Sequence, residues 1–152
     1  MSPTFVKLTC LAWFETMKHA LFAYGTLQLP EMMQRLLGRP VEGVPATLEH
    51  YRSGLVARAN FPGIVPDPGK TVNGSLLTGF RQEDLRRLDA YEGELYRRIR
   101  VEVRLAEPRS QIVKQCWVYC MAHWAQDRVT DTPWTIEWYR QEGAKGRLTY
   151  RS

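Results

Sequence analysis

The sequence predicts an α+β domain built on a small mixed, mainly antiparallel sheet, curved or closed into a barrel, with two or three short helices. Three observations favour this class. The chain has 152 residues, enough for one sizeable core. Its apolar segments are mostly short, strand-like and separated by turn residues. Helical periodicity occurs in only a few segments, which do not alternate with strands as in a doubly wound sheet.

The first predicted elements follow Met17. Residues 19–25 (HALFAYG) form an apolar run that ends at a glycine, which is typical of a buried strand entering a turn. Residues 29–40 (LPEMMQRLLGRP) predict a short helix, because a proline stands near the start and a glycine and a proline stand at the end. Residues 41–56 mix apolar, aromatic, glycine and proline residues, which predicts strands with a bend or bulge.

The middle of the chain changes from strand to helix. Residues 61–70 (FPGIVPDPGK) contain three prolines and two glycines, and we interpret them as a loop with at most a very short edge strand. Residues 72–80 (VNGSLLTGF) predict a strand. Residues 81–93 (RQEDLRRLDAYEG) carry acidic residues early, leucines three apart and a final glycine, which together predict an amphipathic helix.

The last third of the chain contains the clearest strand. Residues 98–105 alternate strictly between polar and apolar side chains, which indicates a half-buried strand. Residues 111–122 (QIVKQCWVYCMA) are its expected antiparallel partner, joined through the EPRS turn. Residues 132–143 (TPWTIEWYRQEG) predict a helix that starts at Thr132 and Pro133 and stops at Gly143.

The charge pattern favours small anionic ligands as much as nucleic acid. The net charge is +5, but the arginines are scattered along the chain. In the strand at 98–105, Arg98, Arg100, Glu102 and Arg104 would share one face, which is the ordinary pattern of a solvated sheet surface. We therefore do not expect a nucleic-acid partner.

The cysteines favour a reducing compartment. Cys10, Cys116 and Cys120 are too few, and odd in number, for a secreted disulfide framework, so we expect a cytoplasmic protein. Cys116 and Cys120 would share one face of a strand as small buried residues. The histidines are dispersed and complete no cluster with these thiols, so we expect no metal site.

The amino-terminal residues carry no convincing targeting signal. No run approaches the roughly 18 apolar residues that a membrane helix needs, so no membrane partner is expected. Residues 1–16 make a poor signal peptide. We interpret them as an extension, with Met17 as the hypothetical native start and residues 17–152 as one domain.

The helix predicted over 81–93 places a carboxylate among its apolar residues. Leu85, Leu88 and Glu92 fall on one face, because steps of three and four residues return to the same direction. Partial desolvation and the carbonyls at the helix end both disfavour a charged carboxylate, so we expect a raised pKa for Glu92. A carboxylate that titrates near neutral pH suits general acid/base catalysis.

Ordinary structural interpretations of these carboxylates stay open at this point. Glu92 could be solvated, or paired with Arg97 or Arg98, which follow closely in the sequence. Asp89 lies one turn earlier on a more exposed side, and we interpret it as a surface aspartate beside Arg86.

A second candidate is the segment FAYGTL, residues 22–27. A buried strand that ends at a glycine leaves the next backbone N–H groups without ladder partners, and such a nest can hold a carboxylate or an oxyanion. A plain strand-to-loop turn has the same local pattern.

These segments together resemble one protein family. FAYGTL, FPGIVPD, VNGSLLTGF and LDAYEGELYRRIRVEV are similar in order and spacing to the γ-glutamylcyclotransferase-like, or AIG2-like, proteins, from about Leu21 to Tyr119. YGTL combined with LDxYEGxxYxR looks most like the branch that acts on γ-glutamylamines. The resemblance implies the same small barrel-like α+β fold, a γ-glutamyl small-molecule substrate, and no metal or other cofactor.

The resemblance also implies a role for individual residues. Glu92 matches the family's catalytic glutamate, and Tyr96 would line the pocket with Arg97 or Arg98 nearby. Backbone N–H groups of a substrate loop would hold the α-carboxylate of the γ-glutamyl group. The residues that match this loop are Tyr24, Gly25, Thr26 and Leu27.

The implied reaction closes a ring within the substrate. The α-amine attacks the side-chain carbonyl, 5-oxoproline forms and an amine leaves, while one carboxylate moves the protons. The alternative is a non-catalytic small-ligand or protein-interaction domain of the same fold, in which Glu92 is structural. The sequence carries no signal for the identity of the amine or for an oligomeric state.

Overall fold

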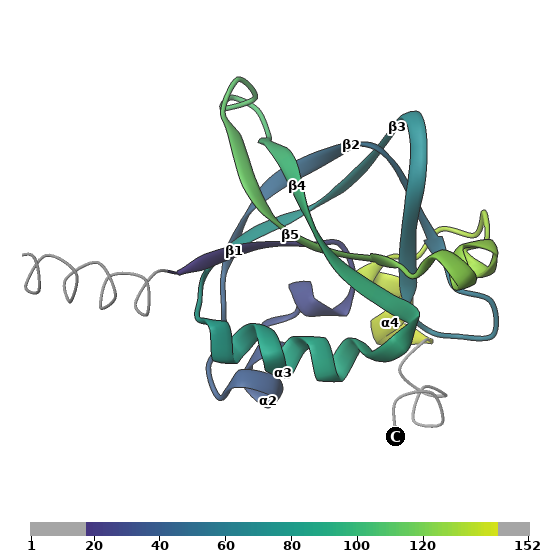
Figure 1. Ribbon diagram of the computed structural model, residues 1–152, viewed down its shortest axis with the longest axis horizontal. Helices are drawn as coiled ribbons and strands as arrows, with labels where there is room; N and C mark the ends of the chain where they lie inside the picture. The colour runs from purple at the N-terminus through teal and green to yellow at the C-terminus, as the bar shows by residue number, and fades with distance from the viewer. Residues whose placement is uncertain (1–17, 143–152) are drawn as a thin grey trace, which may run out of the picture.

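Five strands close into a barrel in the computed structural model of the chain, which describes residues 18–142 (Figure 1). Neighbouring strands are antiparallel in the order β1–β3–β2–β4–β5. The barrel closes where β1 and β5 pair in parallel, Leu21 opposite Trp117. The strands are β1 (His19–Ala23), β2 (Gly43–Leu55), β3 (Pro62–Phe80), β4 (Tyr96–Leu105) and β5 (Val113–Met121). The predicted mixed, mainly antiparallel barrel is confirmed.

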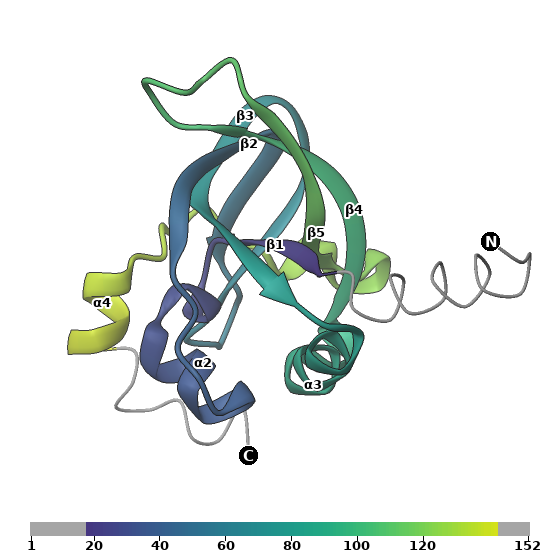
Figure 2. The same cartoon turned by 90° about the vertical axis from the view of Figure 1, so that its left-hand side faces the viewer.

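Helices and short turns gather at one side of the barrel (Figure 2). The α-helices are α2 (Pro30–Leu37), α3 (Gln82–Glu92) and α4 (Ile136–Gln141). The 3-10 turns are η1 (Thr26–Gln28), η2 (Gly93–Leu95) and η3 (His123–Arg128). The helices predicted over 29–40 and 81–93 are therefore confirmed. The proposed extension over residues 1–16, together with Met17 and Cys10, lies outside the described residues.

The carboxy-terminal helix begins later than predicted. Thr135, rather than Thr132, is the residue before α4, and its side-chain oxygen accepts a hydrogen bond from the Trp138 N–H at 3.0 Å. The preceding Trp134 points back to the barrel, where its ring N–H donates to the Asn60 carbonyl at 2.9 Å. This contact holds the segment outside the helix. The predicted stop at Gly143 lies outside the described residues.

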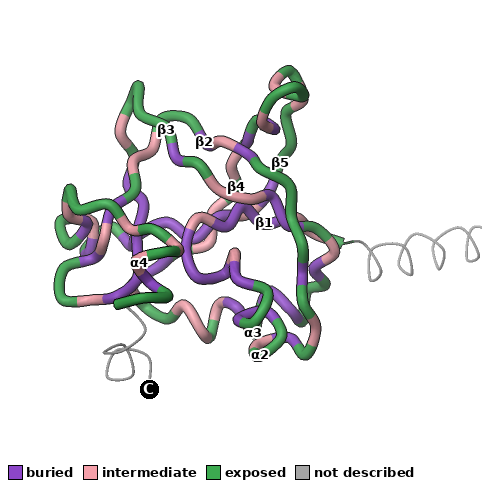
Figure 3. The backbone as a smooth tube through the Cα atoms, turned by 180° about the vertical axis from the view of Figure 1, so that it is seen from behind, coloured by how far each residue is buried: buried purple, intermediate pink, exposed green. Residues whose placement is uncertain are grey.

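Apolar side chains form two packed layers, one inside the barrel and one between the barrel wall and the helices. Figure 3 shows along the backbone which residues are buried. The inner layer contains strand residues only, including Phe22, Leu48, Ile64, Val72 and Val118. The outer layer joins α2 and α3 to the opposite faces of β1, β3 and β5, and it includes Met33, Leu77, Leu85, Leu88 and Met121. Successive side chains of a strand point to opposite faces of the sheet. A strand that contributes side chains to both layers is therefore apolar on both of its faces.

The prediction of a loop over residues 61–70 is wrong. β3 begins at Pro62 and pairs at once with β2, Gly63 opposite Gly54 and Ile64 opposite Ser53. A proline is tolerated as the first residue of a strand because no ladder N–H is required there. Ile64 is fully buried, so its packing in the core stabilises this proline-rich segment as part of the sheet.

The bend predicted within residues 41–56 is confirmed, although these residues form one long strand instead of several. The β2–β3 register shifts between Glu49 and Tyr51, and the intervening His50 has a φ of 68°. The His50 Nδ1 accepts the Gly69 N–H at 3.2 Å. This bulge lets the ribbon fold over the barrel, which is a usual function of β-bulges.

Cys116 and Cys120 are both buried on β5, in the layer inside the barrel. Burial raises the pKa of the Cys116 thiol to about 12 and also raises the pKa of Cys120. Both thiols therefore stay protonated at neutral pH and pack as small apolar groups, as predicted.

Candidate active site

A pocket lies where β1 ends and β3 and β4 begin. It holds about 310 Å³ of space, part of which is open to solvent. Its wall consists of Phe22, Ala23, Tyr24, Gly25, Thr26, Leu27, Pro62, Glu92, Tyr96 and Tyr119. Every site residue predicted from the sequence, except Arg97, lines this pocket.

The first wall is the turn that follows β1. Its hydrogen bonds run from the N–H of Gln28 to the Gly25 carbonyl (3.1 Å) and from the N–H of Leu29 to the Thr26 carbonyl (3.0 Å). The N–H groups at the start of such a turn have no partner within it. Gly25 lies against Pro62, because a Cβ atom there would be only 2.8 Å from the Pro62 Cγ. The glycine thus allows two segments of the wall to approach closely.

The second wall is the end of α3. The helix buries Leu85 and Leu88 completely, and Glu92, its last residue, is half-buried and lines the pocket. The helix stops because Gly93 takes a φ of 76°, and the Gly93 N–H donates to the Asp89 carbonyl. The stop leaves Glu92 at the junction of helix, barrel and turn.

Arginines that follow Glu92 in the sequence do not line the pocket with it. Arg97 is exposed, and the wall includes neither Arg97 nor Arg98. Arg98 pairs instead with Asp89, through Nε to Oδ1 at 2.7 Å and Nη2 to Oδ2 at 3.1 Å. Asp89 is partly exposed, as expected, with 42% of its side chain accessible, but the expected neighbour Arg86 is wrong because its partner is Arg98.

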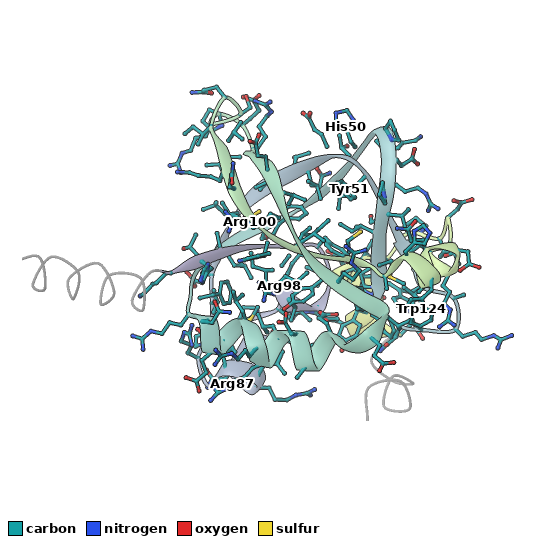
Figure 4. All side chains as sticks on the ribbon, in the orientation of Figure 1. His50, Tyr51, Arg87, Arg98, Arg100 and Trp124 are labelled. Carbon is teal, nitrogen blue, oxygen red and sulfur yellow. The ribbon has the colours of Figure 1, made fainter. Side chains whose placement is uncertain are left out.

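The Asp89–Arg98 pair is joined to the pocket by Tyr119. The Tyr119 hydroxyl donates to Asp89 Oδ1 at 2.7 Å. Figure 4 shows Arg98 between β4 and α3, and its guanidinium stacks on the Trp117 ring, 4.3 Å from the ring centre. This position corrects the expectation of a solvated Arg98, whose side chain is 16% exposed.

These contacts set the charge of the network at neutral pH. Burial would raise the pKa of Asp89, but hydrogen bonds from Arg98 and Tyr119 and the charge of Arg98 outweigh it and lower the pKa. Burial, the hydrogen bond to Asp89 and the negative charges of Asp89 and Glu92 raise the pKa of Tyr119. Asp89 is therefore an anion that can only accept, and Tyr119 is a neutral phenol that donates to it.

Three pocket tyrosines each give their single hydroxyl proton to the protein. The Tyr24 hydroxyl donates to the Tyr119 backbone carbonyl at 2.5 Å, and the Tyr96 hydroxyl donates to the Pro62 carbonyl at 2.6 Å. Tyr119 donates to Asp89. Since carbonyls and carboxylates only accept, none of these hydroxyls keeps a proton for a ligand. A phenol oxygen that donates its proton can still accept a hydrogen bond, a property that suits an amine or ammonium group.

Sequence reasoning missed Tyr119 and the role of Asp89. The available signal for Tyr119 was alternation, because buried Cys116, Val118 and Cys120 leave Trp117 and Tyr119 on the opposite face of β5. No local pattern indicates that this face meets α3.

Within residues 18–142, no cluster of His, Cys, Asp and Glu could hold a metal ion. The described helices are too short or too polar to span a bilayer.

A family model described as gamma-glutamyl cyclotransferase, AIG2-like, matches residues 21–140 of the chain. The chain belongs to this family. The match confirms the resemblance noted in the sequence and extends it beyond Tyr119 through most of α4. The matched residues include most of the barrel, the pocket wall and the Trp134 segment.

Curated relatives in this family come from Arabidopsis thaliana. AIG2-like protein C is 34% identical over 99 residues, covering 65% of this chain and 58% of that protein. AIG2-like protein D is 28% identical over 132 residues, covering 86% of this chain and 84% of that protein. The chain spans 58% of AIG2-like protein C, 52% of AIG2-like protein A and 61% of protein AIG2 C, or somewhat more than half of the length of each.

Solved structures show the same fold. The solution structure of an Arabidopsis thaliana protein has a TM-score of 0.68 at 27% identity, covering 85% of this chain and 76% of that one. The crystal structure of an AIG2-like protein from Mus musculus has a TM-score of 0.60 at 22% identity, covering 78% and 86%. A structure named gamma-glutamyl cyclotransferase has a TM-score of 0.58 at 22% identity, covering 70% and 68%.

Proposed function

We propose that this protein is a γ-glutamyl cyclotransferase that releases 5-oxoproline and an amine, of the type that acts on γ-glutamylamines. One observation carries the proposal. Glu92, at the end of α3, lines the same pocket as the Tyr24–Leu27 turn, although the two segments are far apart in the sequence. A carboxylate beside a turn with N–H groups at its start suits a ligand that carries both an amine and a carboxylate.

The two charged groups of a γ-glutamyl compound fit different walls of the pocket. The α-carboxylate would accept hydrogen bonds from backbone N–H groups of Gly25, Thr26 and Leu27. The α-ammonium would donate to Glu92 and to the Tyr119 oxygen, whose own proton is held by Asp89. This arrangement orients the substrate, because the walls differ in whether they donate or accept.

The chemical step needs proton transfer but no oxidant or reductant. Glu92 takes a proton from the α-ammonium, and the free amine attacks the γ-carbonyl carbon, which forms the ring C–N bond. Glu92 then returns a proton to the departing nitrogen as the original C–N bond breaks. The attacking nitrogen loses its second proton after the ring bond has formed, and the released amine gains a second proton to become an ammonium, so overall two protons pass from one nitrogen to the other. Because attack is intramolecular, the pocket has only to hold a bent conformer and to move these protons.

The test measures 5-oxoproline release from γ-glutamyl-ε-lysine, simple γ-glutamyl amines, γ-glutamyl amino acids and glutathione. We expect turnover of at least one compound. Glu92→Gln should lower kcat/KM by about 10²–10⁴-fold, because the amide keeps the shape but cannot exchange the proton. The matched control is Glu94→Gln, two residues further on and exposed, which should stay within about twofold of the unmodified protein.

Two outcomes would contradict the proposal. A Glu92→Gln variant with near-normal turnover would remove Glu92 from the proton transfer. A folded protein with no turnover of any compound would favour the non-catalytic ligand-binding domain of the same fold. Circular dichroism and a melting curve for each variant establish that a lost activity does not reflect a lost fold.

A further inference from the structure

A second hollow lies at the connection between β2 and β3. It holds about 870 Å³ of space, part of which is open to solvent. Its wall consists of Val56, Ala57, Arg58, Ala59, Phe61, Leu95 and Arg128, and none of these residues lines the candidate active site. Phe61 in this wall and Tyr96 in the active-site wall are both buried and pack ring against ring. We therefore consider the hollow a separate site.

The charge in the wall of this hollow is positive. The wall contains Arg58 and Arg128, both exposed, and otherwise only apolar side chains. Within residues 18–142, no carboxylate is close enough to either guanidinium for an ion pair. Glu94 and Asp127, which adjoin wall residues in the sequence, are exposed and are not part of the wall. Two cations beside an apolar surface are therefore available to an anion.

The apolar surface continues beyond the hollow onto Trp124, in the η3 turn (Figure 4). Trp124 is 58% exposed, more than any other large apolar residue in the described part of the chain. The Arg128 guanidinium lies over its ring, 5.0 Å from the ring centre. Tryptophan and arginine are enriched at the centres of protein interfaces. The composition of this surface therefore favours a protein partner over a small molecule.

The backbone fixes the two arginine-bearing segments relative to each other. Arg58 has a φ of 62°, which is uncommon for a residue with a side chain, and strained positions of this kind cluster at binding sites. The Ala59 N–H donates to the Val56 carbonyl at 3.1 Å, and the Ala57 N–H donates to the Arg128 carbonyl at 2.8 Å. The surface is thus formed before a partner arrives, which lowers the entropic cost of binding.

We propose that the hollow and Trp124 form a docking site for an acidic segment of a partner protein that carries one aromatic or aliphatic anchor residue. The anchor would fill the hollow beside Phe61 and Leu95, and carboxylates on either side of it would pair with Arg58 and Arg128. The inference goes beyond the proposed function, because binding at this site requires no turnover in the active-site pocket.

Charge decides between an acidic partner and the other occupants. A second copy of the chain carries the same net charge of +5 and would be repelled, whereas an acidic protein would be attracted from a distance. Residues 143–152 of the chain contain three basic and no acidic side chains, and residues 1–17 contain one acidic side chain. Neither segment supplies carboxylates on both sides of an anchor.

The test titrates three unlabelled peptides, blocked at both ends, into ¹⁵N-labelled protein and follows the amide signals by NMR. The peptide DEFDE carries the anchor and the acidic flanks, DEADE lacks the anchor, and KRFKR has reversed charges. We expect DEFDE to bind at least about tenfold more tightly than either control peptide. It should shift the amide signals of Ala57, Leu95 and Arg128 and leave those of Gly25 and Thr26 in the active-site turn unchanged.

Variants assign the binding to this surface. Arg58→Gln/Arg128→Gln and, separately, Trp124→Ala should each lower the affinity for DEFDE at least about fivefold, because each removes part of the surface that the peptide contacts. All three residues are exposed, so the fold should be retained, which circular dichroism checks. The control Arg109→Gln, an exposed arginine in the β4–β5 hairpin, should stay within about twofold of the unmodified protein.

Several results would overturn the docking site. DEFDE could bind no better than DEADE or KRFKR, keep its affinity in both variants, or shift the active-site turn instead of the hollow. Equal affinity for N-acetylphenylalanine would make the hollow a small-molecule site. Self-association in sedimentation that is lost in the double arginine variant, without peptide binding, would assign the surface to a second copy of the chain.

Discussion

Replacing Asp89 by asparagine removes one negative charge beside the candidate pocket and changes its shape little. Asp89 accepts two hydrogen bonds from Arg98 and one from Tyr119. The Arg98 side chain is 16% exposed and the Asp89 side chain 42% exposed. Hydrogen bonds to charged groups contribute about 1.5–3 kcal/mol, whereas exposed ion pairs contribute about 0–1 kcal/mol. For this half-exposed pair we expect Asp89→Asn to lower the free energy of unfolding by about 1–2 kcal/mol.

The loss should appear as a melting temperature lower by about 2–8 °C, since 1 kcal/mol corresponds to about 2–4 °C in a chain of this size. The stability difference between Asp89→Asn and the unmodified protein should also depend on pH. The pKa of Asp89 is lowered in the folded protein, so its ionised form stabilises the fold at neutral pH. That contribution is lost as the pH falls below about 4, through the folded-state pKa. The stability difference from the variant should therefore shrink in acid.

Activity separates a positioning role from a purely structural one. In Asp89→Asn, the factor by which KM rises should exceed the factor by which kcat falls by about five- to tenfold. The reason is that the Tyr119 hydroxyl is then held less rigidly beside the substrate ammonium. Tyr119→Phe should have at least as large an effect. In the double variant the two effects should not add, since both act through one contact.

A matched control exists on the same helix. Glu83→Gln makes the same chemical change in a pair with Arg87, where both side chains are more than half exposed (71% and 54%) and the contact is 3.0 Å. We expect a loss below about 0.5 kcal/mol and unchanged kinetics. If Asp89→Asn is no more destabilising than this control and KM is also unchanged, the contacts of Asp89 neither stabilise the fold nor position Tyr119.

Two further predictions concern other contacts. Asp84→Asn should cost about 2 kcal/mol at pH 7, because the carboxylate accepts the Arg81 N–H at 2.9 Å and pairs with Arg39 at 2.8 Å. Hydrogen bonding to Arg39 lowers the pKa of Asp84, so the stabilisation by its carboxylate is lost below about pH 4. In urea unfolding, the stability difference between Asp84→Asn and the unmodified protein should therefore fade below that pH. A constant difference would count against the pair with Arg39. Gly25→Ala should lower kcat/KM at least about tenfold while far-UV circular dichroism is retained, because the added methyl group meets Pro62 at 2.8 Å. Normal turnover would contradict the close approach.

Local patterns were sufficient where one segment carried the whole signal. The period of residues 81–93 predicts α3 and its end beside Glu92, and the alternation of 98–105 predicts β4. Periodicity and capping depend on neighbours within a few residues, so one sequence contains them. The antiparallel partner at 111–122 was also predictable, because a short turn leaves few alternatives.

The sequence by itself determined the kind of domain, the family resemblance and a carboxylate at the end of a helix. Tertiary structure alone decided which side chains meet. It drew the proline-rich segment of β3 into the barrel, paired Asp89 with Arg98 instead of Arg86, and brought Tyr119 to the pocket. These contacts depend on the register of strands distant in sequence and on the β1–β5 closure. Neither the strand register nor the barrel closure produces a periodic pattern within one segment of the sequence. Register is set by the packing of side chains on both faces of the barrel wall.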